Sequence, residues 1–86
     1  MSINIDDLKK KIIYRSNYRG SKELDLLLSS FSKQIINNLN DEELNDLFNF
    51  LGLDDESLYK FYNGIKTSVT IKNNKISKLF KNFKLK

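Results

Sequence analysis

The strongest structural signal in this chain lies in residues 21–35, SKELDLLLSSFSKQI. Apolar side chains recur there with the period of an α-helix, at Leu24, Leu27, Leu28, Phe31 and Ile35. This spacing lines one side of a helix with an apolar stripe, and such a stripe must face a core. Ser21 stands where a helix N-cap is expected. The stretch therefore predicts an amphipathic helix that the rest of the fold must cover.

A shorter helix is expected on each side of this segment. On the N-terminal side it covers about residues 5–15, with Asn4 as its N-cap. On the C-terminal side it begins at Asn40, because Asn40 and Glu43 have the spacing of a capping box, and it stops at Gly52. The apolar stripe of this third helix consists of Leu44, Leu47, Phe48 and Leu51.

Two more helices are expected towards the C-terminus. The fourth is capped by Asp54 or Asp55 and ends at Asn63 and Gly64. The fifth begins at about Lys72. Its apolar stripe consists of Ile76, Leu79, Phe80 and Phe83. Between these helices, residues 68–71 are rich in β-branched side chains and predict an extended connection.

The composition limits the fold to one small helical domain. The chain has 86 residues, of which 40% are hydrophobic, with three Gly and no Pro or Cys. A chain of this length supports one core, since it buries only about 60 to 65% of its extended surface. We therefore predict an all-α fold, a compact bundle of about five short helices, in which residues 1–86 form a single helical domain.

The junction ahead of the long helix has an unusual composition. Thirteen of the fifteen basic residues are Lys, and the only two Arg, Arg15 and Arg19, lie just before Gly20. Arg offers a planar fork of donors that Lys cannot copy. The clustering indicates that the geometry of the cation matters here, and Glu23 and Asp25 add carboxylates beside it.

Residues 14–31, YRSNYRGSKELDLLLSSF, carry R-G-x-x-E followed by L-D-x-x-L-x-x-F. With this motif, its length and its order of elements, the chain resembles the SdhE-type family of small succinate dehydrogenase assembly factors. Residues 54–61, DDESLYKF, are similar to the aspartate-started helix of that family. The resemblance covers nearly the whole chain.

The resemblance implies a binding module. Such a module binds the flavoprotein subunit of succinate dehydrogenase, or of the related fumarate reductase, and promotes covalent attachment of FAD to a histidine of that subunit. Arg19, Gly20 and Glu23 carry over from the motif as partner-binding residues, and Arg15 and Asp25 flank it as further candidates. The FAD belongs to the partner, so the chain is expected to bind no cofactor itself. We also expect a monomer.

The residue types also argue against an enzyme. The chain has no His and no Cys, so the usual general base, the usual nucleophile and most transition-metal ligands are missing. Glu23 and Asp25 lie two apart on a helix, where side chains diverge by about 200° and cannot face one atom. The three glycines are isolated, which excludes a phosphate-binding loop. We expect no catalytic residue and no metal site.

The charge is uneven along the chain. Residues 1–64 carry eight basic and eleven acidic side chains, whereas residues 65–86 carry seven Lys and no acid, which gives the net charge of +4. A Lys-rich end is typical of a solvated helix face or of a nucleic-acid-binding surface. We favour the solvated face and expect no nucleic acid partner. The alternative function is that of a small basic helical nucleic-acid-binding protein.

The sequence contains no presequence pattern at its N-terminus. It also contains no run of the roughly 20 apolar residues that a membrane span needs. We therefore expect a cytoplasmic protein with no membrane insertion.

The motif leaves several alternatives open. Arg19 and Glu23, four residues apart, either pair along the helix or form an exposed cluster that docks on a partner and contributes little to folding. Gly20 is expected to end the first helix with a positive φ. Tyr14 and Tyr18 serve either core packing or partner contact.

Overall fold

The computed structural model describes residues 4–17 and 19–85. Within these residues the chain forms α-helices and one 3-10 turn, without a β-strand, so the prediction of an all-α fold is confirmed. The elements are α1 (Ile5–Ser16), α2 (Lys22–Ile35), the 3-10 turn η1 (Ile36–Asn38), α3 (Asp41–Phe50), α4 (Asp55–Tyr62) and α5 (Lys75–Asn82).

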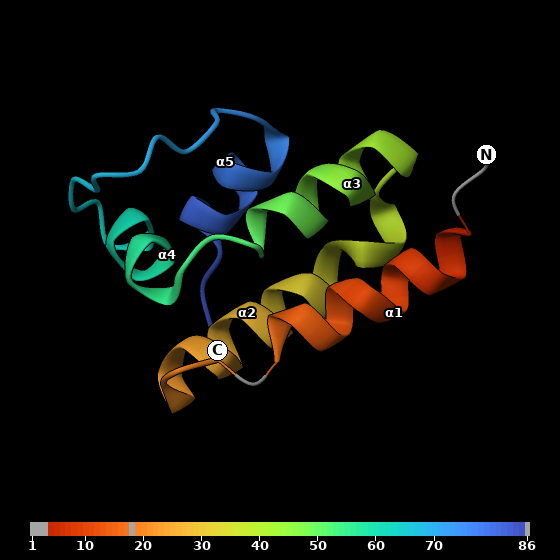
Figure 1. The fold of residues 1–86 in the computed structure, drawn as a ribbon, viewed down its shortest axis with the longest axis horizontal. Coiled ribbons are helices and arrows are strands. Elements are labelled where there is room, and N and C mark those ends of the chain that lie inside the picture. Colours follow the sequence, from red (N-terminus) through yellow and green to blue (C-terminus); the bar gives the residue numbers. More distant parts are fainter. Residues whose placement is uncertain (1–3, 18, 86) are drawn as a thin grey trace.

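The helices form two adjoining groups that share α3, namely α1, α2 and α3, and α3, α4 and α5 (Figure 1). α1 packs against α2 and α3, while α5 packs against α3 and α4. Beyond α5, Lys84 and Leu85 line a hollow together with Glu23 and Leu24 at the beginning of α2. The radius of gyration of the Cα atoms is 12.4 Å. This value is close to the roughly 12 Å expected of a compact chain of this length, so the bundle is compact as predicted.

The helices begin where short polar side chains satisfy free backbone N–H groups. Asn4 accepts from two such groups at the start of α1, and Ser21 accepts from one in α2. At the start of α3, Asn40 and Glu43 form the expected capping box. The Asn40 backbone N–H lowers the pKa of the Glu43 carboxyl, and the Lys75 ammonium 3.1 Å away acts in the same direction. These local contacts explain why the predicted starts of the first three helices agree with the structure.

Phe80 lies at the centre of the core. Its ring centroid is 5.2 Å from that of Phe31, 5.3 Å from that of Phe50 and 5.1 Å from that of Tyr62. Phe31 and Phe80 are fully buried, and the surrounding cluster takes side chains from all five α-helices. Because these rings come from four helices, the aromatic cluster joins the two groups of helices.

α5 differs from its prediction in its start and in its buried face. It begins at Lys75 rather than at about Lys72, because Asn74 caps it through reciprocal hydrogen bonds with Ser77. Phe80 is fully buried, whereas Leu79 is 36% exposed. The prediction that Leu79 belongs to the core stripe is therefore wrong.

The two neighbouring positions allow a matched test of the core. We expect Phe80→Ala to lower the free energy of unfolding by about 3 to 5 kcal/mol, because it leaves a cavity among three rings. Leu79→Ala should cost less than about 1 kcal/mol, since much of that side chain is already in water. Urea unfolding followed by circular dichroism measures both values. Equal losses for the two variants would contradict this description of the core.

Candidate functional site

The Arg19 side chain holds the turn between α1 and α2, and it is only 10% exposed. Its Nη1 donates to the backbone oxygens of Arg15 at 2.8 Å and Leu51 at 3.1 Å. Its Nη2 donates to the backbone oxygen of Leu53 at 3.1 Å, and its Nε lies 2.8 Å from Asp55 Oδ1. The Nε contact is an ion pair rather than an aligned hydrogen bond. One guanidinium thus joins the end of α1, the α3–α4 loop and the first turn of α4.

The acceptors of Arg19 explain why an arginine occupies this position. The last carbonyl groups of a helix have no partner within the helix and carry its partial negative charge. α3 has no basic residue in its own last turn, so the cation comes from another part of the chain. A guanidinium can donate in several directions within one plane, whereas a Lys ammonium is a single point charge. The arrangement therefore requires the arginine fork.

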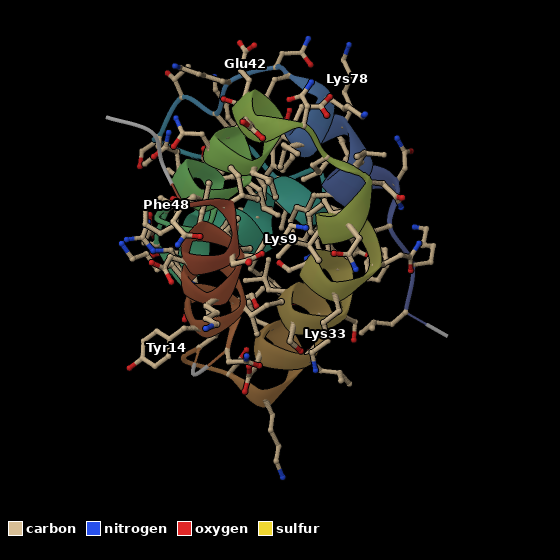
Figure 2. All side chains as sticks on the ribbon, turned by 90° about the vertical axis from the view of Figure 1, so that its right-hand side faces the viewer. Lys9, Tyr14, Lys33, Glu42, Phe48 and Lys78 are labelled. Carbon is tan, nitrogen blue, oxygen red and sulfur yellow. The ribbon has the colours of Figure 1, made fainter. Side chains whose placement is uncertain are left out.

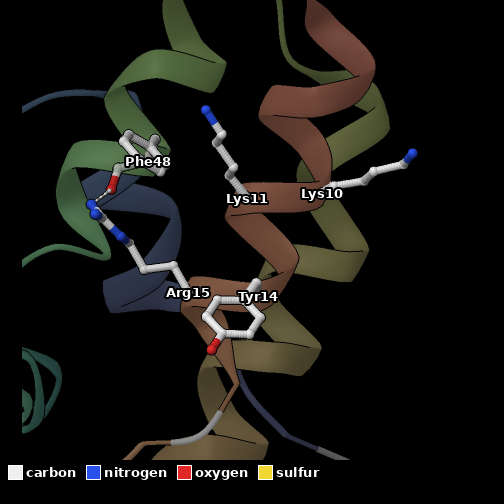
Figure 3. Close-up of a pocket in the computed structure, with 5 residues that line it drawn as sticks. All are labelled: Lys10, Lys11, Tyr14, Arg15 and Phe48. Atoms are coloured by element: carbon white, nitrogen blue, oxygen red, sulfur yellow. Dashed lines mark hydrogen bonds between the residues drawn. The ribbon is translucent and has the colours of Figure 1, made fainter.

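Arg15 also caps the end of α3. Its Nη1 donates to the backbone oxygen of Phe48 at 3.1 Å, and its Cζ lies 4.0 Å from the centroid of the Phe48 ring (Figure 3). A Cβ at Gly52 would lie 2.9 Å from Arg15 Nη1, so the glycine leaves room for the cation. Phe48 was predicted to lie in the core stripe of α3, but it is only half-buried beneath Arg15, and Phe50 is buried instead.

Gly20 is required for a close approach of Asp55. The Gly20 N–H donates to Asp55 Oδ2, and a Cβ at Gly20 would lie 2.8 Å from that oxygen. Among the described glycines only Gly64 has a positive φ, of 72°. The prediction of a positive φ at Gly20 is therefore wrong, and the contact with Asp55 is the physical reason for the glycine.

Glu23 is exposed and does not pair with Arg19. Asp55, which lies 36 residues after Arg19 in the chain, takes the position of the counterion. The alternative of a helical Arg19–Glu23 pair is therefore wrong, and so is the expectation that Arg19 is exposed. Of the predicted partner-binding residues, Gly20 and Glu23 are exposed, whereas Arg15 and Asp25 are half-buried.

Two features lie on the surface around Gly20, Glu23 and Asp25, which we call the motif face. Asp25 Oδ1 is buried and has no hydrogen-bond donor among the described residues. A hollow of about 230 Å³ opens beside the motif. It lies between α2, α4 and the C-terminal end, and its lining includes Glu23, Leu27, Tyr59, Asn63, Lys84 and Leu85. The motif face therefore offers the Glu23 carboxylate, the Lys84 ammonium and a lining of apolar and aromatic side chains.

The sequence did not distinguish the two aspartates at the start of α4. Asp54 is the N-cap, since its side chain accepts from the backbone N–H and the hydroxyl of Ser57. The Ser57 hydroxyl lowers the pKa of the Asp54 carboxyl. Asp55 is thereby left to pair with Arg19. No local pattern marks that role, because it depends on a contact between distant parts of the chain.

The remaining site predictions have different outcomes. Tyr14 is 73% exposed, so core packing is excluded for it, while Tyr18 lies outside the described residues. In the described part of the chain, no group of three His, Cys, Asp or Glu side chains is arranged to hold a metal ion.

Comparisons with known proteins agree in the family that they indicate. A family model described as flavinator of succinate dehydrogenase matches residues 10–84, which include the whole motif. The succinate dehydrogenase assembly factor 2, mitochondrial, of Debaryomyces hansenii is 35% identical over 80 residues, which cover 88% of this chain and 56% of the relative. No solved structure matches the chain.

Two further relatives carry similar names. The factor of Saccharomyces cerevisiae is 37% identical over 65 residues, which cover 74% of this chain and 40% of the relative. The factor 2-A of Drosophila willistoni is 33% identical over 76 residues, which cover 85% of this chain and 48% of the relative. The chain spans about half the length of the curated relatives it matches.

The arginine fork can be tested with a conservative change. We expect Arg19→Lys to lower the free energy of unfolding by about 2 to 4 kcal/mol, because an ammonium leaves some of the buried carbonyl groups without a donor. The matched control is Lys22→Ala, which removes an exposed cation nearby and should cost no more than about 0.5 kcal/mol. Chemical denaturation gives both values. A loss for Arg19→Lys no larger than that of the control would rule out the proposed role of the fork.

The role of Gly20 can be tested by a double-mutant cycle. Gly20→Ala should lower the free energy of unfolding by about 1 to 2 kcal/mol, because the added methyl group displaces Asp55. In an Asp55→Ala background the same change should cost almost nothing. Gly52→Ala is the control, since its methyl group meets Arg15 instead and its cost should be the same in both backgrounds. If the losses of unfolding free energy for Gly20→Ala and Asp55→Ala are additive, the contact with Asp55 does not restrict the residue at position 20.

Proposed function

This chain belongs to the family of flavinators of succinate dehydrogenase, and we propose that it binds the flavoprotein subunit of that enzyme and promotes covalent attachment of FAD to a histidine there. The observation that carries the proposal is the arrangement of the R-G-x-x-E motif. Arg19 is buried and holds the turn, whereas Gly20 and Glu23 are exposed on it. An exposed carboxylate beside a turn that is fastened by Arg19 is suited to docking.

The proposed mechanism is the positioning of the partner rather than chemistry by this chain. The sequence has no His, so the flavin-bearing histidine must belong to the flavoprotein. Binding energy at the motif face would favour the flavoprotein conformation in which flavin and histidine are aligned. The chain then acts as an assembly factor without a catalytic residue of its own.

The size of the hollow beside the motif supports the assignment of FAD to the partner. Its volume is about 230 Å³. Pockets that enclose ligands of drug size usually have about 300 to 1,000 Å³, and FAD is larger than such ligands. The hollow is suited to a side chain of the partner, and we propose that FAD does not bind beside the motif and stays with the flavoprotein.

The contacts of the C-terminal lysines favour the solvated face over the nucleic-acid alternative. Lys75 pairs with Glu43 at 3.1 Å. Lys81 lies 5.5 Å from the ring centroid of Phe61, and Lys84 lies 6.0 Å from that of Tyr62. Three of the seven C-terminal lysines therefore have partners within the fold. A nucleic-acid complex would also weaken steeply with added salt, which a filter-binding titration would reveal.

The compartment and the oligomeric state are further parts of the proposal. The relatives named above are mitochondrial by name. No helix in residues 4–17 or 19–85 is long and apolar enough to cross a membrane. We propose that the protein is cytoplasmic and acts as a monomer. Light scattering of the purified chain would test whether it is a monomer.

The motif face can be tested with two acidic residues in equivalent positions. Glu23 and Glu42 are both exposed and both lie in the first turn of a helix, α2 and α3 respectively. We expect Glu23→Ala to weaken flavoprotein binding by about 2 kcal/mol, as at an interface centre, and Glu42→Ala to have almost no effect. Covalent flavin is measured by in-gel fluorescence in cells that lack the native factor. A wild-type signal with folded Glu23→Ala would remove Glu23 from the mechanism.

A further inference from the structure

A second surface lies on the outer side of α1 and is formed by Lys10, Lys11, Tyr14, Arg15 and Phe48. We call it the α1 surface. These residues line an open hollow of about 660 Å³ between α1 and α3 (Figure 3). Its rim is cationic, because Lys10 and Lys11 are exposed, and its wall is the Phe48 ring with the Arg15 guanidinium over it.

Tyr14 stands as a ridge beside this hollow. It is 73% exposed and points away from the body of the protein (Figure 2). On its other side a second hollow of about 460 Å³ lies between α1 and η1, and both Lys10 and Tyr14 line it as well. Ile13 and Ile36 supply aliphatic walls there. The α1 surface thus continues on both sides of one exposed aromatic ring.

Lys10, Lys11 and Arg15 are the cations of the α1 surface. Among the described residues, no acidic side chain lies within ion-pair distance of Lys10, Lys11 or Arg15. Lys10 and Tyr14 are four residues apart, as are Lys11 and Arg15, so all four side chains project from neighbouring positions of one helix face. The charge here is positive in a part of the chain, residues 1–64, that is acidic as a whole.

We propose that the α1 surface docks an acidic segment of the flavoprotein partner that also presents apolar side chains. This inference rests on the proposed function and adds a second contact area to the motif face. Carboxylates of the segment pair with Lys10 and Lys11, and its apolar side chains enter the hollows on either side of Tyr14. Charge complementarity of this kind sets the orientation of a complex and speeds its formation.

The extent of the charge favours a protein segment over a nucleic acid. Asp6 and Asp7 lie in the first turn of α1, so the cationic face is confined to the part of the helix that follows them. The lysines of α5 do not extend it, because α5 packs against α3 and α4. A nucleic acid needs a row of cations that follows its phosphates, whereas a short acidic segment needs only this cluster beside apolar walls.

The test compares two charge reversals of equal size. The variant Lys10→Glu/Lys11→Glu changes the α1 surface, and Lys33→Glu/Lys78→Glu changes two exposed lysines on α2 and α5 (Figure 2). Each is titrated against the purified flavoprotein subunit by calorimetry. We expect Kd to rise about tenfold or more for the first variant and less than about threefold for the second. Tyr14→Ala, with an unchanged melting temperature, should raise Kd about fivefold or more.

Crosslinking by a carbodiimide identifies the chemistry of the contact, since it joins a Lys ammonium directly to a carboxylate. We expect linked peptides between Lys10 or Lys11 and an Asp- or Glu-containing segment of the flavoprotein. If both charge reversals weaken flavoprotein binding equally, or if neither weakens it, the inference is overturned. The proposed function then remains in place.

Two other outcomes are distinct from these. A wild-type chain that does not bind the flavoprotein overturns the proposed function, and this inference with it. A duplex oligonucleotide that binds the wild type but not Lys10→Glu/Lys11→Glu, with flavoprotein binding unchanged, would assign the α1 surface to nucleic acid instead.

Discussion

The structure depends on one buried cation, the Arg19 guanidinium. It donates to carbonyl groups at the ends of α1 and α3 and pairs with Asp55 at the start of α4. A helix end presents partial negative charge, and a helix start favours a carboxylate. One arginine therefore donates to the ends of two helices and pairs with a carboxylate at the start of a third. Without it, several polar groups would be partly buried with no partner, which is costly in any fold.

The residues of the R-G-x-x-E motif have two different roles: Arg19 and Gly20 hold the turn, and Glu23 is exposed to solvent. Arg19 lies inside, and Gly20 allows Asp55 to approach the backbone closely. Glu23 lies one turn further along and is exposed. The same motif thus fixes the shape of the turn and displays a carboxylate on it. For the proposed role, a turn fastened in this way is an advantage, since a segment that must be ordered on binding loses binding energy.

The net charge of +4 does not show where the exposed cations lie on the surface. The lysines of the C-terminal part partly contact residues of their own fold, among them Glu43 and the Phe61 ring. Lys10 and Lys11 of α1 are exposed beside an exposed tyrosine, Tyr14. The net charge alone is therefore a poor guide to where exposed cations gather, because Lys10 and Lys11 lie in the part of the chain that is acidic as a whole.

The sequence by itself determined the helices, because the period of the apolar residues and the caps Asn4, Ser21 and Asn40 are local properties. It also located the motif, which a family shares as a linear pattern. It did not determine the partner of Arg19 or the reason for Gly20. Both follow from Asp55, which is distant in the chain and is brought to the turn only when α3 and α4 pack. Tertiary structure decided these points because an ion pair depends on distance in space, and local spacing reports that distance only within one helix.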